Sequence, residues 1–232
     1  NVVESTIARN SDWVLPIHAG PEVGVASTKA FLGQLLVLFL LSLKISKIRD
    51  DIDQKFYEKS IKDLKRIPDA IEESLKSESN IQAIAKEFIE AKGSMFLGRG
   101  SSFPIALEGA LKLKELSYLH AEGYPAGEMK HGPLALIEEG LPVIIIAPKD
   151  KYFEKTLSNM QEVIARGGKI IFITDNKKII SNDNIRFGLR VPFLNNLLSP
   201  MLLTIPLQLL AYHVALLKNC DIDKPRNLAK SV

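Results

Sequence analysis

The sequence predicts an α/β fold, in which helices cover both faces of a parallel β-sheet. The first observation is that two β-branched runs, "LPVIIIAP" (141–148) and "KIIFITD" (169–175), are apolar through their centres. Such runs are typical of strands that are buried on both faces. The second observation is that segments with helical spacing, such as 104–120 and 152–168, alternate with these strands. This alternation favours parallel strands joined by helices.

The remaining elements are expected in a simple order along the chain. The first 80 residues are expected to hold a strand end (12–17), a loop containing Gly and Pro (18–28), an apolar helix to about residue 45, and two or three amphipathic connecting helices with a break at 76–80. The later residues are expected to hold strands at 94–98, 141–148, 169–175 and 185–192, and helices at 104–120, 152–168 and 199–218. Ser199 is predicted as the N-cap of the last helix, with Pro200 as its first residue.

Charge, cysteine content and hydropathy exclude several classes of protein. The net charge of +3 is too small to indicate a nucleic-acid partner. The single cysteine, Cys220, cannot form an internal disulfide and is typical of a reducing compartment, so we expect a cytoplasmic protein. The most apolar run, "LLVLFLLSL" (35–43), is shorter than the roughly 20 residues that a membrane-spanning helix needs. We therefore expect no membrane association, and a core or interface helix here.

A weak internal repeat suggests that the chain holds one whole α/β unit and the end of another. "FLGQLLVLFLLSLK" (31–44) and "IPLQLLAYHVALLK" (205–218) are identical at five of fourteen positions. Leucine-rich helices also match by chance, so coincidence stays an open alternative. The chain starts with Asn1 rather than Met, and we expect it to be a fragment.

A narrow charged stripe crosses an otherwise apolar helix in "EGALKLKELSYL" (108–119). At 100° per residue, Glu108, Lys112 and Glu115 fall within about 60° of one another. One interpretation is a structural ion pair at a domain contact, because buried charges must pair. The other is a cleft carboxylate that acts as a base beside an ammonium group. The residues alone leave both open.

Other polar residues also admit two interpretations. "GRGSS" (98–102) joins a strand to a helix, where an anion can bind, but a tight turn explains its glycines equally well. His131 lies in the polar loop "GEMKHGP" and can either transfer protons or simply face solvent. Ser27 and Thr28 are expected as helix caps. Lys230, near the end of the chain, is a solvated tail lysine unless the tail folds back.

No cofactor or metal is predicted. The four histidines, His18, His120, His131 and His213, show no metal-ligand spacing. His213 lies on an apolar helix and is expected in the core.

Four stretches together resemble one family. They are "HAGPEVGVASTKAF" (18–31), "LGRGSSFPIALEGALKLKELSYLHAEGYPAGEMKHGPLALI" (97–137), "IPLQLLAYHVALLK" (205–218) and "DKPRNLAKSV" (223–232). The chain resembles, from end to end, the carboxyl-terminal isomerase part of the glutamine–fructose-6-phosphate aminotransferase (glucosamine-6-phosphate synthase) family. The resemblance implies sugar isomerase (SIS) domains, which are flavodoxin-like three-layer sandwiches. It divides the chain into the end of a first SIS domain (1–46), connecting helices (47–80), a second SIS domain (81–218) and a catalytic tail (219–232).

The same resemblance assigns roles to individual residues. It makes Glu115 the base that moves a proton between C1 and C2 of a sugar phosphate, with Lys112 beside it in the site. It makes Lys230 the lysine that forms a Schiff base with fructose 6-phosphate. It makes His131 a ring-opening histidine donated by a neighbouring subunit, which implies a homodimer. Val25 and Ser27 are expected to contact the sugar, and Glu108 is grouped with these substrate-binding residues.

Two departures from the family pattern limit what the chain is expected to do alone. The Ser- and Thr-rich phosphate loop of the first SIS domain has no counterpart here, and "IAPKD" (146–150) carries no hydroxyl group. The glutamine-hydrolysing domain with its terminal cysteine is also missing from this chain, and Cys220 cannot replace that cysteine. We expect the parent enzyme to make glucosamine 6-phosphate and the isolated chain to be nearly inactive. The alternatives are a non-catalytic, sugar-phosphate-sensing SIS module and a simple phosphosugar isomerase or deaminase.

Overall fold

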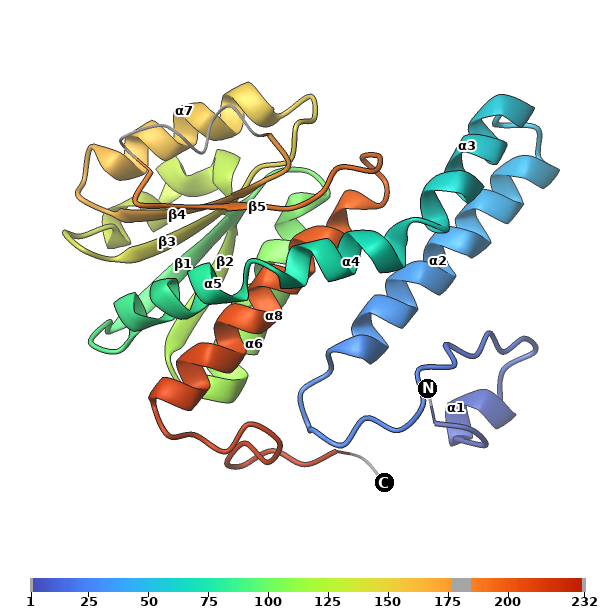
Figure 1. Ribbon diagram of the computed structural model, residues 1–232, viewed down its shortest axis with the longest axis horizontal. Helices are drawn as coiled ribbons and strands as arrows, with labels where there is room; N and C mark the ends of the chain where they lie inside the picture. Colours follow the sequence, from blue (N-terminus) through green and yellow to red (C-terminus); the bar gives the residue numbers. More distant parts are fainter. Residues whose placement is uncertain (1, 177–184, 231–232) are drawn as a thin grey trace.

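A five-stranded parallel sheet forms the middle of the structure, which is a computed structural model describing residues 2–176 and 185–230. The strands are β1 (Gly93–Gly98), β2 (His120–Pro125), β3 (Pro142–Ile146), β4 (Lys169–Thr174) and β5 (Phe187–Arg190). They lie in the order β2-β1-β3-β4-β5, and every neighbouring pair is parallel (Figure 1). The predicted parallel α/β sheet is therefore confirmed.

Two details of the strand prediction are wrong. β2 was not predicted, because its residues "HAEGYP" include glycine, proline and a charge and so give no apolar run. This segment becomes an edge strand because its backbone pairs with β1. Conversely, residues 12–17 form no strand. None of the described strands pairs with them, and an extended backbone needs such a partner.

The longer helices occupy the expected stretches, whereas α1 and the 3₁₀ helices were not predicted, and the helix predicted at 104–120 ends at Ser117. The α-helices are α1 (Thr6–Arg9), α2 (Lys29–Ile48), α3 (Gln54–Leu64), α4 (Ile67–Leu75), α5 (Glu78–Ala85), α6 (Ser102–Ser117), α7 (Phe153–Ile164) and α8 (Ser199–Leu217), and short 3₁₀ helices are η1 (Lys86–Phe88), η2 (Ala126–His131) and η3 (Pro133–Leu136). Three connecting helices, α3 to α5, follow α2, and the predicted break falls at the turn 76–77.

The N-cap of α8 lies one residue earlier in the chain than predicted. The helix already includes Ser199, so that Leu198 is its N-cap. Asn195 Oδ1 accepts hydrogen bonds from the N–H groups of Leu197 and Leu198. The Ser199 hydroxyl therefore does no capping and donates to the Asn195 carbonyl oxygen at 3.0 Å.

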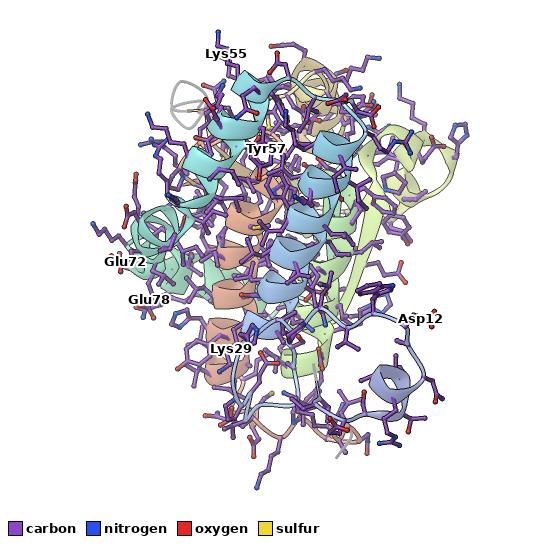
Figure 2. All side chains as sticks on the ribbon, turned by 90° about the vertical axis from the view of Figure 1, so that its right-hand side faces the viewer. Asp12, Lys29, Lys55, Tyr57, Glu72 and Glu78 are labelled. Carbon is purple, nitrogen blue, oxygen red and sulfur yellow. The ribbon has the colours of Figure 1, made fainter. Side chains whose placement is uncertain are left out.

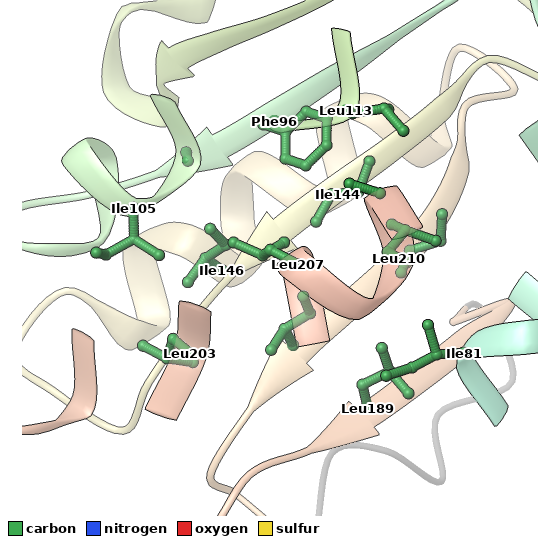
Figure 3. Close-up of a cluster of buried hydrophobic side chains, with 14 of the residues drawn as sticks. Ile81, Phe96, Ile105, Leu113, Ile144, Ile146, Leu189, Leu203, Leu207 and Leu210 are labelled. Carbon is green, nitrogen blue, oxygen red and sulfur yellow. The ribbon is translucent and has the colours of Figure 1, made fainter. Parts of the chain in front are cut away.

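Apolar side chains fill both spaces between the sheet and its helices. On one face, alternate strand residues such as Phe96, Ile144 and Ile146 pack against α5, α6 and α8 (Figure 3). On the other face, their neighbours, such as Leu97 and Ile145, pack against α7 and the η2–η3 segment. The three central strands, β1, β3 and β4, are thus buried on both sides, as the continuous apolar runs of β3 and β4 predict, whereas the edge strands β2 and β5 are partly exposed. The three-layer arrangement is confirmed.

A tight connection brings α6 directly out of β1. A Cβ atom on Gly98 would lie 2.3 Å from the carbonyl oxygen of Ser102, so only glycine fits there. Gly100 has a φ of +54° and lies against the ring of Tyr152. The tight-turn interpretation of "GRGSS" thus accounts for its glycines, and Tyr152 covers the turn.

α2 lies outside the sandwich, on the side that faces the viewer in Figure 2, with Lys29 in its first turn. Two described helices, α2 and α8, are long and apolar enough to cross a membrane by length and composition alone. Two-thirds of the apolar window of α8 lies inside the core, whereas only 6% of that of α2 is buried. The run 35–43 is therefore part of a 20-residue helix that the described chain leaves largely uncovered. The length argument against a membrane span fails for this helix, and the absence of a membrane role stays a prediction.

Candidate active site

The charged stripe of α6 forms a nearly buried cluster of three ionisable side chains. Lys112 Nζ lies 2.8 Å from Glu115 Oε2 and 3.5 Å from Glu108 Oε1. The exposed fractions of the Lys112, Glu108 and Glu115 side chains are 4%, 11% and 14%. One ammonium therefore stands between two carboxylates, and the cluster carries one excess negative charge when all three groups are ionised.

The two carboxylates of the cluster differ in their surroundings. Burial raises the pKa of Glu108, and the negative charge of Glu115 adds to this, while the ammonium of Lys112 opposes it. Glu115 holds the shorter, hydrogen-bonded contact with that ammonium. The cluster therefore offers two adjacent carboxyl groups. Because its pKa is raised, the carboxyl group of Glu108 takes up a proton more easily than that of an ordinary glutamic acid.

Lys230 folds back onto the loop 18–28 and is not a solvated tail residue. Its Nζ donates hydrogen bonds to the carbonyl oxygens of Glu22 and Gly24 at 2.8 and 2.7 Å, and to Glu22 Oε2 at 3.3 Å. Figure 1 shows the end of the chain passing below this loop. The tail lysine and the loop thus form one structural unit across 208 positions of sequence.

The tail is attached at two further points. The N–H of Val25 donates to the carbonyl oxygen of Asp223 at 2.9 Å. The N–H of Arg226 donates to the Tyr118 hydroxyl at 2.8 Å, and the guanidinium of Arg226 lies 4.2 Å from the centre of the Tyr118 ring. Tyr118 is the residue that ends α6, in a left-handed conformation. The tail therefore connects the loop 18–28 with the end of the helix that carries the charged cluster.

A cavity of about 430 Å³ lies between these elements. Its lining comes from the loop 18–28, the end of α6, α8 and the tail, and includes Glu22, Leu116, Gln208, Tyr212 and Asp223. A larger hollow, of about 1080 Å³, is lined only by residues of the first 21, and neither hollow has a predicted site residue in its lining. The smaller cavity is therefore the better candidate for a ligand site, because it lies where the tail, the loop and α6 meet.

Comparison with known proteins identifies the family. A family model described as "SIS domain" matches residues 87–218, which is more than half of the chain. The chain belongs to the SIS domain family.

Relatives of this SIS chain carry the name that the sequence motifs indicate. Proteins named glutamine–fructose-6-phosphate aminotransferase [isomerizing] are 50% identical in Bartonella quintana and 52% identical in Rhizobium meliloti, over 100% of this chain. The chain spans only 38% of the length of these relatives. The resemblance to this family is confirmed.

Solved structures agree with the fold. The C-terminal domain of glucosamine-fructose-6-phosphate aminotransferase from Francisella tularensis is 45% identical, with a TM-score of 0.93 over 97% of this chain and 64% of that chain. Glucosamine-6-phosphate deaminase from Thermotoga maritima is 27% identical, with a TM-score of 0.72 over 99% of this chain and 64% of that one.

The SIS chain brings together some of the predicted site residues and separates others. Lys112, Glu115 and Glu108 form one cluster, and Val25 and Lys230 belong to the loop–tail unit. Ser27, in the same loop, is partly buried. No hydrogen bond or ion pair joins the cluster to Lys230 in the described residues.

His131 lies apart from both groups. It ends η2, which packs with α7 on the face of the sheet opposite α6. Its side chain is 77% exposed, and Nε2 lies 3.8 Å from Glu128 Oε2. His213, the one histidine predicted in the core, is buried as expected, and its Nε2 lies 3.1 Å from Glu78 Oε1. Among the described residues, no group of three His, Cys, Asp or Glu side chains could hold a metal ion.

Sequence reasoning misses one functional candidate, Glu22. Thr28 is the N-cap of α2 by position, as expected, but its side chain makes no capping hydrogen bond. Glu22 Oε1 takes this role and accepts from the N–H groups of Thr28 and Ala30 at 2.9 and 3.2 Å. The signal available in the sequence was a carboxylate six residues before a predicted cap, inside a motif already singled out.

Proposed function

We propose that this chain is the isomerase part of a glutamine–fructose-6-phosphate aminotransferase and acts on a sugar phosphate. The observation that carries the proposal is the position of Lys230, whose amine is hydrogen-bonded to the loop 18–28, in a tail that also contacts Tyr118 at the end of α6 through Arg226. The 50–52% identity with relatives of that name over the whole chain supports it. The proposed substrate is fructose 6-phosphate, and the proposed product of the longer enzyme is glucosamine 6-phosphate.

The proposed reaction uses Lys230 as nucleophile and Glu115 as base. The neutral amine of Lys230 attacks the C2 carbonyl of the open-chain sugar, water leaves, and an iminium forms. In the longer enzyme, ammonia from glutamine then adds to C2 and displaces the Lys230 amine, so that the sugar keeps an iminium at C2 and the lysine is released. This iminium withdraws electrons from C1, so that a carboxylate can remove a proton there and return one to C2, which leaves an aldehyde at C1 and an amine at C2. Lys112, which lies 2.8 Å from Glu115, fixes the orientation of that carboxylate. Val25, Ser27 and Glu108 are proposed to contact the substrate.

The proposed functional unit is a homodimer in which His131 serves the neighbouring subunit. Its imidazole is 77% exposed and makes no contact with Lys112, Glu115 or Lys230 in the described chain. A histidine can donate and accept a proton near neutral pH, as the opening of a sugar ring requires. In a homodimer, His131 of one subunit would lie at the site of the neighbouring subunit, although it is remote from the site of its own chain.

We further propose that the longer enzyme supplies what this chain lacks. The curated relatives are more than twice as long, because the chain covers 38% of them. The phosphate-binding loop and the glutamine-hydrolysing domain are assigned to the remaining length, and the enzyme is proposed to be cytoplasmic. The isolated chain should then show almost no glutamine-dependent synthesis.

A second candidate function is that of a simple phosphosugar isomerase or deaminase. The similarity to the Thermotoga maritima protein named glucosamine-6-phosphate deaminase favours it, at 27% identity over 99% of the chain. The 50–52% identity with the aminotransferases ranks the first proposal higher. A non-catalytic sensing module is ranked lowest, since it has no need of a held Lys230.

Borohydride trapping tests the proposal. The protein, extended upstream to include a complete first SIS domain, is incubated with fructose 6-phosphate and reduced, and its peptides are mapped by mass spectrometry. A reduced sugar adduct on Lys230 is the expected result. Binding of the sugar phosphate without a lysine adduct would refute the Schiff base. Synthesis of glucosamine 6-phosphate that depends on glutamine separates the aminotransferase from the deaminase.

A further inference from the structure

Glu22 makes two sets of contacts with its two carboxylate oxygens. Oε1 accepts hydrogen bonds from the N–H groups of Thr28 and Ala30 and from the Thr28 hydroxyl, at 2.9, 3.2 and 3.2 Å. Oε2 lies 3.3 Å from Lys230 Nζ. The Glu22 side chain is only 9% exposed. One buried carboxylate therefore links the first turn of α2 to the end of the tail.

The ammonium of Lys230 is fully engaged in this arrangement. An ammonium group has three donors, and Nζ has three acceptors within 3.3 Å, namely two carbonyl oxygens and the Glu22 carboxylate. Two of these acceptors belong to Glu22 itself. The position of the amine is thus set mainly by one residue.

We propose that Glu22 is a positioning residue that holds Lys230 at the site and ties this position to the start of α2. The inference rests on the proposed function for its catalytic meaning. Among the three acceptors, only the Glu22 carboxylate is ionisable. When the Lys230 amine is neutral, its attraction to this carboxylate is therefore the interaction that weakens most. Lys230 can then leave its resting position when a sugar carbonyl arrives and return to it when the product has left.

The electrostatics of Glu22 fit positioning rather than proton transfer. Burial tends to raise its pKa, but the hydrogen bonds from Thr28, Ala30 and Lys230 outweigh this and lower the pKa below its ordinary value. A carboxylate with a lowered pKa stays ionised at neutral pH and is a poor proton acceptor.

Glu22 also holds the part of the tail that has few other attachments. The backbone contact of Asp223 with Val25 and the contacts of Arg226 with Tyr118 lie upstream of it. Beyond Arg226, the described tail makes one further backbone hydrogen bond, which the N–H of Leu228 donates to the carbonyl oxygen of Pro225 within a turn. Removal of the Glu22–Lys230 contact should therefore free the lysine without unfolding the domain.

The variant Glu22→Gln separates the two roles. A glutamine keeps an acceptor oxygen for the N–H groups of Thr28 and Ala30, but places an N–H₂ donor opposite the lysine. We expect reductive methylation of Lys230 in the ligand-free, full-length protein to become about tenfold faster, since a hydrogen bond between charged groups is lost. Exposed Lys155 on α7 serves as the internal reference. The matched control Thr28→Val removes one hydrogen bond on the α2 side and should leave the labelling of Lys230 unchanged.

The same variants are assayed with fructose 6-phosphate. If Glu22 positions the amine for attack, Glu22→Gln lowers kcat about tenfold and changes KM by less than about threefold, because the interaction acts on the reacting lysine and not on sugar binding. A merely structural role would change the two parameters together or neither of them.

The outcomes separate this inference from the proposed function. Equal labelling of Lys230 in the wild-type protein and in Glu22→Gln would overturn the inference even if the wild-type protein forms the sugar adduct. Faster labelling in Glu22→Gln with an unchanged kcat would overturn the catalytic meaning and leave a purely structural contact. Faster labelling in a protein whose wild type forms no adduct supports the hold on Lys230 and refutes the Schiff-base function instead.

Discussion

Replacement of Lys112 by methionine tests whether the charged cluster of α6 is as buried as the structure shows. The Lys112 side chain is 4% exposed and is the only cation within 4 Å of Glu108 and Glu115 among the described ion pairs. Methionine keeps most of the side-chain length and volume but removes the charge. The change therefore leaves two carboxylates facing each other with no cation between them.

The expected loss of stability is large for a single substitution. Removal of one partner from a buried ion pair typically lowers the free energy of unfolding by about 3–5 kcal/mol. The shorter contact, at 2.8 Å, and the second, at 3.5 Å, both disappear. The residual exposure of the carboxylates, 11% and 14%, lets some water in and places the expected value near the lower end of this range, at about 3 kcal/mol.

The assay is urea unfolding followed by circular dichroism at pH 7 and pH 5. The loss should be smaller at pH 5, where the unpaired carboxylates can take up protons. Lys114→Met is the matched control, because Lys114 is exposed on the same helix and should change the free energy of unfolding by less than about 0.5 kcal/mol. A loss below about 1 kcal/mol for Lys112→Met would refute the buried cluster, since it is the value of a solvated surface pair.

Three further predictions concern pH, backbone packing and the tail. Burial raises the pKa of Glu108 above its ordinary value of 4.5, so just above that pH the folded state binds more protons than the unfolded state, and the free energy of unfolding falls as pH rises. Glu108→Gln should remove this fall in a series of unfolding free energies measured at different pH values. An unchanged slope would contradict the raised pKa. Gly98→Ala places a methyl group too close to the Ser102 carbonyl oxygen and should destabilise the fold by about 1–3 kcal/mol. Calorimetry should therefore show a lower thermal midpoint, and an unchanged midpoint would show that the turn can relax. Arg226→Ala removes the cation–π contact with Tyr118, worth about 0.5–1 kcal/mol, and should speed amide exchange in residues 223–230 about two- to fivefold, whereas unaltered exchange would mean that the tail is held elsewhere.

The periodic features of the sequence predicted much of the fold. The apolar runs at 141–148 and 169–175 contain β3 and β4, which are buried on both faces as such runs indicate. The stripe of Glu108, Lys112 and Glu115 also proved to be one cluster. Side chains three and four positions apart on a helix are neighbours whatever surrounds the helix, so their spacing alone was sufficient.

Edge pairing and burial of α2 could not be predicted in the same way. β2 carries no apolar run, because an edge strand is defined by the backbone that pairs with it. The apolar residues of α2 predict a covered helix, yet Leu38 and Ile48 are 59% and 68% exposed. A hydropathy pattern indicates that an apolar surface needs a covering partner. It does not indicate whether that partner is another part of this chain.

The sequence by itself determined the α/β class, the two best strands and the charged stripe, because these depend on the period of a single helix or strand. Only the tertiary structure decided that Lys230 rests on Glu22 and that His131 lies on the opposite face from α6. A contact between residues 208 positions apart depends on the whole path of the chain. The residues next to Lys230 and those next to Glu22 show no sequence pattern that predicts this contact.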